Sequence, residues 1–127
     1  MNVTYFACLA IFFPSVLLSQ PELKILEESY TFDTITKGDL CKHDFLIVNS
    51  GNEPLIISNT KTSCGCDVAS WPKEPIMPND TSIITYKYDS NRVGPFKKSM
   101  TISSNDKLPY RVVRISGVIL PEDETSR

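Results

Sequence analysis

Apolar and polar residues alternate along much of this chain, and the alternating runs are short. The clearest run spans residues 82–89, where Ile84, Tyr86 and Tyr88 fall on one side and polar residues separate them. A period of two residues is that of a strand with one buried face. The pattern therefore predicts a half-buried β-strand over residues 82–89.

Six further runs of this kind are each bounded by Gly, Pro, Asn or Asp, and no helical segment long enough for a crossover lies between them. Short strands spaced about 8 to 12 residues apart are typical of all-β domains. We therefore predict one immunoglobulin-like, mainly antiparallel β-sandwich of about seven strands. The expected strands are residues 23–28, 30–35, 40–49, 55–62, 82–89, 96–103 and 110–120. On the inner faces we expect Phe45, Ile47, Met100, Ile102, Val113, Ile115 and Ile119.

The two ends of the chain differ from this pattern. Residues 1–19 contain no charge and are almost continuously apolar from residue 5 to residue 18, which is typical of a secretory signal peptide. A membrane span needs about 20 apolar residues, and Pro14 interrupts the run, so a permanent anchor is the weaker alternative. We expect cleavage after Ser19, a sandwich over residues 20–121 and a flexible acidic tail over residues 122–127. The expected location is periplasmic or extracellular, where disulfides form.

Composition and charge exclude several classes of function. The expected domain is rich in Val, Ile and Thr and has one Ala, so an all-helical fold is excluded. The net charge of −2, with no basic block in the sequence, argues against nucleic acid or an anionic membrane as the main partner. The single histidine, His43, removes most histidine-based enzyme mechanisms. We therefore expect a protein that is not an enzyme, with a thiol-exchange activity left open.

Cys64-Gly65-Cys66 is the candidate for chemistry. Two thiols this close can face one soft ion, copper or zinc, with Cys41 or His43 as further ligands. If the expected strands 40–49 and 55–62 paired as a hairpin, Cys41 would lie opposite about Thr62. Cys41 would then be a better third ligand than His43. The alternatives are a disulfide from Cys41 to Cys64 or Cys66, a disulfide within the Cys64-Gly65-Cys66 segment, and a thiol-exchange role.

Two further features have both a functional and a structural interpretation. Residues 70–80 contain three prolines and predict a loop, in which Trp71, Pro72 and Ile76 are candidate contacts for a protein partner. Trp71 alternatively covers the end of the sandwich. His43 alternates with inward-facing residues, so a buried ring that makes a hydrogen bond is favoured over a metal ligand.

Residues 32–119 contain the motifs Phe32-Asp33-Thr34-Ile35, Gly38-Asp39, His43-Asp44-Phe45, Val48-Asn49-Ser50-Gly51-Asn52-Glu53-Pro54-Leu55, Ser63-Cys64-Gly65-Cys66, Trp71-Pro72-Lys73-Glu74-Pro75-Ile76 and Gly94-Pro95-Phe96. Together they resemble the bacterial domain-of-unknown-function 1573 family. The resemblance implies an Ig-like sandwich akin to ASPM/SPD-2/Hydin and major sperm protein domains, in exported proteins with no reaction attached. Asn79 stands where that family has a turn glycine, and since Asn tolerates a positive φ we expect the turn to be kept. Cys41 is not part of the family's pattern.

The leading hypothesis is an exported, non-enzymatic Ig-like module at the cell envelope. It would bind a protein partner, or serve structural placement, through the 70–80 loop, the adjacent cysteine turn or an exposed sheet edge. The alternative is a protein that binds or handles copper or zinc at Cys64 and Cys66.

Overall fold

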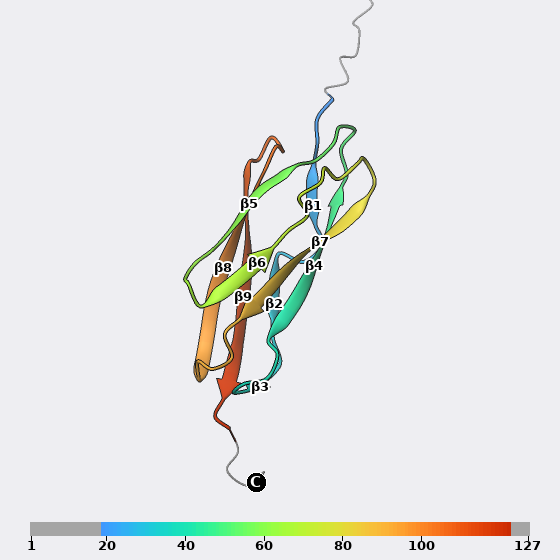
Figure 1. Cartoon of the computed structure of the whole chain (residues 1–127). Coiled ribbons are helices and arrows are strands. Elements are labelled where there is room, and N and C mark those ends of the chain that lie inside the picture. Colours follow the sequence, from blue (N-terminus) through green and yellow to red (C-terminus); the bar gives the residue numbers. More distant parts are fainter. Residues whose placement is uncertain (1–18, 123–127) are drawn as a thin grey trace, which may run out of the picture.

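The computed structural model describes residues 19–122, which form two packed β-sheets (Figure 1). Sheet A has the strand order β1-β4-β7-β6, and sheet B has the order β2-β9-β8-β5, with β3 also paired to β9. The strands are β1 (Leu23–Ile25), β2 (Ser29–Thr31), β3 (Ile35–Thr36), β4 (Lys42–Asn49), β5 (Ile57–Thr62), β6 (Asp67–Ser70), β7 (Thr81–Tyr88), β8 (Gly94–Ser104) and β9 (Tyr110–Leu120). The predicted all-β sandwich is confirmed.

Parts of the sequence analysis concern segments beyond these residues. The predicted leader, apart from Ser19, and the tail from residue 123 onward lie outside the described part of the chain. Within residues 19–122, no helix is long and apolar enough to cross a membrane.

The inner faces of the two sheets form one core. Every residue predicted to face inward is buried: Phe45, Ile47, Ile84, Tyr86, Tyr88, Met100, Ile102, Val113, Ile115 and Ile119. Burial of each such side chain stabilises the fold by about 1.5 to 3 kcal/mol before entropy is considered. Period-two alternation therefore identifies the part of the core that β4, β7, β8 and β9 contribute.

The strand count and two pairings differ from the expectation. The predicted 30–35 strand is split into β2 and β3, and both run parallel to β9, with Tyr30 opposite Ile115 and Ile35 opposite Ile119. The short β6 was not predicted, because a four-residue strand is too short to show a period. It pairs antiparallel with β7, placing Asp67 opposite Tyr88.

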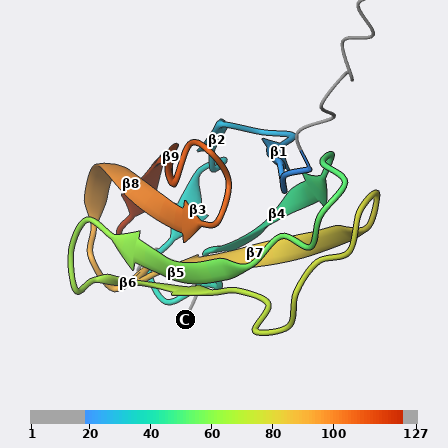
Figure 2. The same ribbon diagram turned by 90° about the horizontal axis from the view of Figure 1, so that it is seen from above.

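The chain changes sheets at two opposite sides of the sandwich (Figure 2). The connection from β1 to β2 joins the sheets at one pair of edge strands, and the connection from β5 to β6 joins them at the other pair. The chain also changes sheets between β3 and β4, β4 and β5, and β7 and β8. The hairpin that would place Cys41 opposite Thr62 is not formed, because β4 pairs with β1 and β7 while Thr62 of β5 lies opposite Met100. The connection through Pro54 takes the chain from sheet A to sheet B, whereas a hairpin would have kept it in one sheet.

The turn at Asn79 is kept, as the sequence predicts. Asn79 has φ of 68°, and its amide donates to the carbonyl of Asn49 at 2.8 Å. Asn is among the non-glycine residues that adopt this left-handed conformation at low cost. Asn79, which stands where the related family has glycine, therefore preserves the turn that leads into β7.

Candidate functional site

The Cys64-Gly65-Cys66 turn connects β5 of sheet B to β6 of sheet A. The structure joins Cys64 to Cys66, whose Cα atoms are 5.4 Å apart. Cys66 is buried, Cys64 is partly buried, and both pack against the core. A Cβ atom at Gly65 would meet nothing within 4 Å, and its φ is not in the left-handed region, so the turn has no steric need for glycine there.

Asp67 completes a group of three possible metal ligands with the two cysteines. The ligand atoms of Cys64, Cys66 and Asp67 all lie within 4.8 Å of one another. Carboxylate Oδ1 of Asp67 is 3.9 Å from Sγ of Cys64. The sequence analysis missed Asp67, although a carboxylate directly after the second cysteine was the available signal.

Asp67 is held in place by Tyr86, a fully buried residue of β7. The Tyr86 hydroxyl donates a 2.6 Å hydrogen bond to Oδ2 of the buried Asp67 carboxylate. Burial raises the pKa of Tyr86, and the hydrogen bond to Asp67 raises it further. The Tyr86 hydroxyl is therefore the hydrogen-bond donor, and the Asp67 carboxylate is the acceptor.

Cys41 and His43, the further ligands expected from the sequence, are not grouped with the cysteine pair in this structure. Neither belongs to the three-ligand group. Cys41 is a buried free cysteine whose carbonyl accepts from the amide of Tyr88 at 2.9 Å. Burial raises the pKa of its thiol, which disfavours the thiolate form needed for metal binding or exchange.

His43 lies in an aromatic cluster on the side of the sandwich where the chain passes from β1 to β2. Its imidazole stacks on Tyr30 with ring centroids 3.5 Å apart and meets the edge of Phe45 at 4.7 Å. The predicted hydrogen bond is not formed: Nε2 is 3.5 Å from Oε1 of Glu27 and has no hydrogen-bond partner. The ring is therefore inward-facing, as expected, and acts in packing.

The proline-rich loop places its candidate residues in different environments. Ile76 is buried and exchanges two 2.8 Å backbone hydrogen bonds with Leu55, so its prediction as a partner contact is wrong. Trp71 packs against the core. Nζ of Lys73 lies 3.1 Å from the centroid of the Trp71 ring. Pro72 is partly exposed and lines a hollow of about 180 Å³ where the loop meets β7.

Three apolar side chains form a row across the outer face of sheet A. Leu46 of β4 lies directly opposite Ile83 of β7, and the amide of Leu26 donates to the Leu46 carbonyl at 3.3 Å. Leu26, Leu46 and Ile83 are 49, 39 and 47% exposed. Thr81, two residues before Ile83 on the same side of β7, lines the hollow beneath the loop, so the row and the hollow adjoin.

Comparison with known proteins places this architecture in a group of related folds. The family described as "Protein of unknown function (DUF1573)" matches residues 23–119. No curated protein matches the chain. A protein of unknown function from Porphyromonas gingivalis W83 is 18% identical with a TM-score of 0.70, and the match covers 84% of this chain and 51% of that one. The present chain thus spans about half the length of that protein.

Two further structures share the fold. The ASH/PapD-like domain 7 of human CEP192 is 12% identical with a TM-score of 0.69, over 97% of this chain and 99% of that one. The CupB2 chaperone of Pseudomonas aeruginosa is 10% identical with a TM-score of 0.57, over 81% of this chain and 57% of that one. These likenesses establish an Ig-like, PapD-like sandwich, and a fold of this kind hosts many functions.

Proposed function

Since this chain belongs to the DUF1573 family, which is described as being of unknown function, we propose a role from its own surfaces: it is an exported, non-enzymatic module that binds a protein at the cell envelope. The binding face is the outer side of sheet A, from the row of Leu26, Leu46 and Ile83 to the hollow under the 70–80 loop.

The apolar row is the observation that carries this proposal. The outer face of a sandwich normally meets water, and its strands there alternate with polar residues. Three adjacent, exposed aliphatic side chains, two on neighbouring strands and one directly after β1, interrupt that pattern, and contiguous apolar surface of this kind marks interaction sites. The partner would contribute a complementary apolar surface, with Pro72 at its rim.

Two further observations support the proposal. The uncharged apolar segment before Gln20 has the composition of an export signal. Among the described residues, hydrogen bonds to the sandwich begin at Gln20, whose amide donates to Oδ1 of Asn52 at 2.8 Å. The amide of Asn52 also donates to the carbonyl of Gln20 at 3.2 Å, and a domain that starts at Gln20 would keep this hydrogen bond after cleavage.

Photo-crosslinking tests the binding face in cells that naturally make the protein. With a photoreactive amino acid at position 46 or 83, we expect a discrete crosslinked partner, because both positions lie in the apolar row. Ile83→Lys should abolish the adduct formed from position 46, since a lysine there would have to be desolvated against apolar surface. The measurement is the yield of the adduct on immunoblots.

Val112 provides the matched control, because it is 46% exposed on the outer face of sheet B. A probe at position 112 should give no such adduct, and Val112→Lys should leave the adduct from position 46 unchanged. Equal crosslinking from positions 46 and 112, or no effect of Ile83→Lys, would contradict the proposal.

A second candidate function rests on the group formed by Cys64, Cys66 and Asp67. In the reduced protein, two thiolates and one carboxylate would supply three ligands to zinc or copper, with a fourth position open to water or a partner. This function requires the two cysteines to be reduced in the mature protein, whereas a disulfide between them favours the binding module.

Intact mass and elemental analysis of the exported protein separate the two candidates. For the binding module we expect a mature chain that starts at Gln20, contains no metal, and gains one alkyl group after denaturation, at Cys41. Reduction before alkylation should raise this to three groups. Three alkylated thiols without reduction and one equivalent of zinc or copper, lost in Cys64→Ser/Cys66→Ser but kept in Cys41→Ser, would establish the metal function instead.

A further inference from the structure

The two sheets differ sharply in charge. The strands of sheet B contain five basic residues and no acidic residue. The strands of sheet A contain three basic and two acidic residues, so the excess of positive charge is larger in sheet B. The basic residues of sheet B are Lys61, Lys97, Lys98, Arg111 and Arg114.

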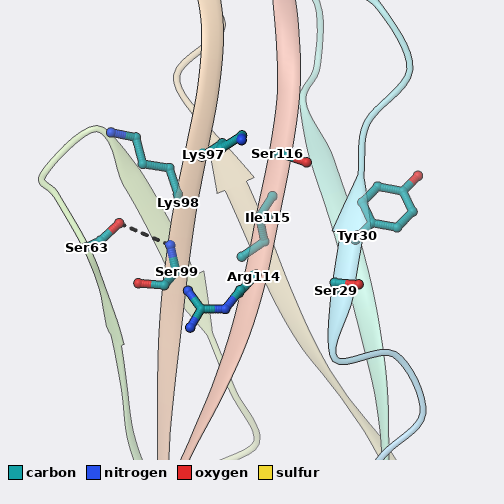
Figure 3. A pocket seen from close by; sticks show the side chains of 9 residues that line it. All are labelled: Ser29, Tyr30, Ser63, Lys97, Lys98, Ser99, Arg114, Ile115 and Ser116. Carbon is teal, nitrogen blue, oxygen red and sulfur yellow. Dashed lines mark hydrogen bonds between the residues drawn. The ribbon is translucent and has the colours of Figure 1, made fainter.

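Three of these cations line a hollow of about 370 Å³ in sheet B (Figure 3). Lys97 and Lys98 come from β8, and Arg114 comes from the neighbouring strand β9, with its side chain extended toward Ser99. The pairing of Ser99 with Arg114 sets this approach. All three side chains are basic, so an anion in the hollow would be attracted to each of them.

The three cations are not neutralised by the protein itself. Between residues 19 and 122, the ion pairs are His43 with Glu27 and Arg111 with Glu28, and neither includes a residue of the hollow. The hollow has no acidic residue in its lining. Positive charge is therefore presented to solvent at this place.

Hydroxyl groups surround the cations. Ser29, Ser63, Ser99 and Ser116 all line the hollow, and Tyr30 and Ile115 add apolar surface. The amide of Ser99 donates to the hydroxyl of Ser63 at 3.2 Å, which ties the segment after β5 to β8. A hydroxyl both donates and accepts, so this lining suits a ligand that carries hydroxyl groups next to its charge.

Two further hollows adjoin this one. A second hollow of about 260 Å³ shares Ser63 and Ser99 with it and adds Lys61. A third, of similar size, shares Lys97 and Ser116 and is bounded by Phe96. A charged group held at Arg114 would thus have room for an attached body along the sheet.

We propose that this hollow binds the phosphate or sulfate ester of a small polyhydroxyl molecule, such as a sugar phosphate or a sugar sulfate. Arg114 and Lys97 contact the oxyanion, because a guanidinium offers paired donors to such a group and an ammonium adds a point charge. The serine hydroxyls bind the hydroxyl groups of the body. The site lies in sheet B, away from the proposed protein-binding face of sheet A, so each proposal stands or fails separately.

Isothermal titration calorimetry on the mature protein tests this site with glucose 6-phosphate, glucose 6-sulfate, inorganic phosphate and glucose. We expect the two sugar esters to bind with Kd on the order of 0.1 to 1 mM, inorganic phosphate more weakly, and glucose not measurably. Preference for one ester identifies phosphate or sulfate as the group that is recognised. Raising the salt concentration to about 0.5 M should weaken binding, because it shortens the screening length to a few ångströms.

Charge-matched variants localise the binding. Arg114→Gln should weaken ester binding about tenfold, because it removes a charge-assisted hydrogen bond. Lys87→Gln makes the same change in net charge on the outer side of sheet A and should leave Kd unchanged. Circular dichroism should show that both variants remain folded. No ester binding up to about 10 mM, well above the Kd expected for such a site, or equal weakening by both variants, would overturn the proposal, and so would glucose binding as tightly as its esters.

Discussion

Replacing Asn49 with alanine is expected to lower the free energy of unfolding by about 3 to 5 kcal/mol. Asn49 is fully buried at the end of β4. Its Nδ2 donates to the carbonyls of Glu53 and Ile76 at 2.7 and 2.9 Å, and its Oδ1 accepts from the amides of Gly51 and Glu22 at 3.0 and 3.3 Å. These four bonds use the full hydrogen-bonding capacity of a carboxamide.

The size of this effect follows from what the substitution leaves behind. Alanine removes the partners of four backbone groups from three separate segments, and an unsatisfied buried polar group costs about 1 to 3 kcal/mol. Asn49→Asp has nearly the same shape but replaces both donors with an acceptor that faces two carbonyl oxygens. We therefore expect the aspartate to be at least as destabilising as the alanine.

Urea denaturation, followed by the fluorescence of the single tryptophan Trp71, measures this prediction. Asn105 is the matched control, because its carboxamide also binds two backbone groups, the amide of Ile56 and the carbonyl of Pro54, but at an exposed position. Asn105→Ala should cost about 1 kcal/mol. Similar losses of unfolding free energy in Asn49→Ala and Asn105→Ala would contradict the prediction. They would show that the buried hydrogen bonds of Asn49 contribute no more to stability than the exposed ones of Asn105.

Replacing Tyr86 with phenylalanine is expected to cost about 2 to 3 kcal/mol, although the substitution removes a single oxygen atom. The ring is fully buried and keeps its packing. The lost hydroxyl is the donor to Oδ2 of Asp67, so a carboxylate that is itself buried loses a charge-assisted hydrogen bond. Few Tyr-to-Phe changes remove a bond of this kind, and the effect should be correspondingly large.

A double-mutant cycle isolates this bond. With Asp67→Asn as the second substitution, the double variant should lose about 1 to 2 kcal/mol less than the sum of the single losses, because the two groups act on each other. Tyr110→Phe is the control: its ring is 71% exposed, and we expect a change within about 0.5 kcal/mol. Additive losses for Tyr86 and Asp67 would mean that their contact contributes nothing to stability.

The strands predicted from the sequence are those whose pattern is local. Ile84, Tyr86 and Tyr88 alternate over five residues, and the inward residues of β9 alternate in the same way, because one buried face imposes a period of two on neighbouring positions. The conformation of Asn79 is also local, since it depends on one residue's own allowed φ. Such features need no knowledge of the rest of the chain.

The errors in strand pairing concern choices between distant segments. The pairing of β4 with β7, in place of β5, depends on which arrangement buries the whole core, and nothing in residues 41–62 alone decides it. That choice moved Cys41 away from the cysteine pair. It also brought Asp67 to the hydroxyl of Tyr86, 19 positions later in the chain.

The sequence by itself determined an all-β sandwich, its inward-facing residues and the closeness of Cys64 to Cys66, because each depends on residues a few positions apart. Only the tertiary structure decided which side chains share a site. Arg114, Lys97 and Ser63 line one hollow because β9, β8 and β5 are neighbours in one sheet, although the sequence contains no basic block. Strand pairing is selected by the free energy of the complete core, and it therefore sets surface charge and ligand geometry that no local pattern contains.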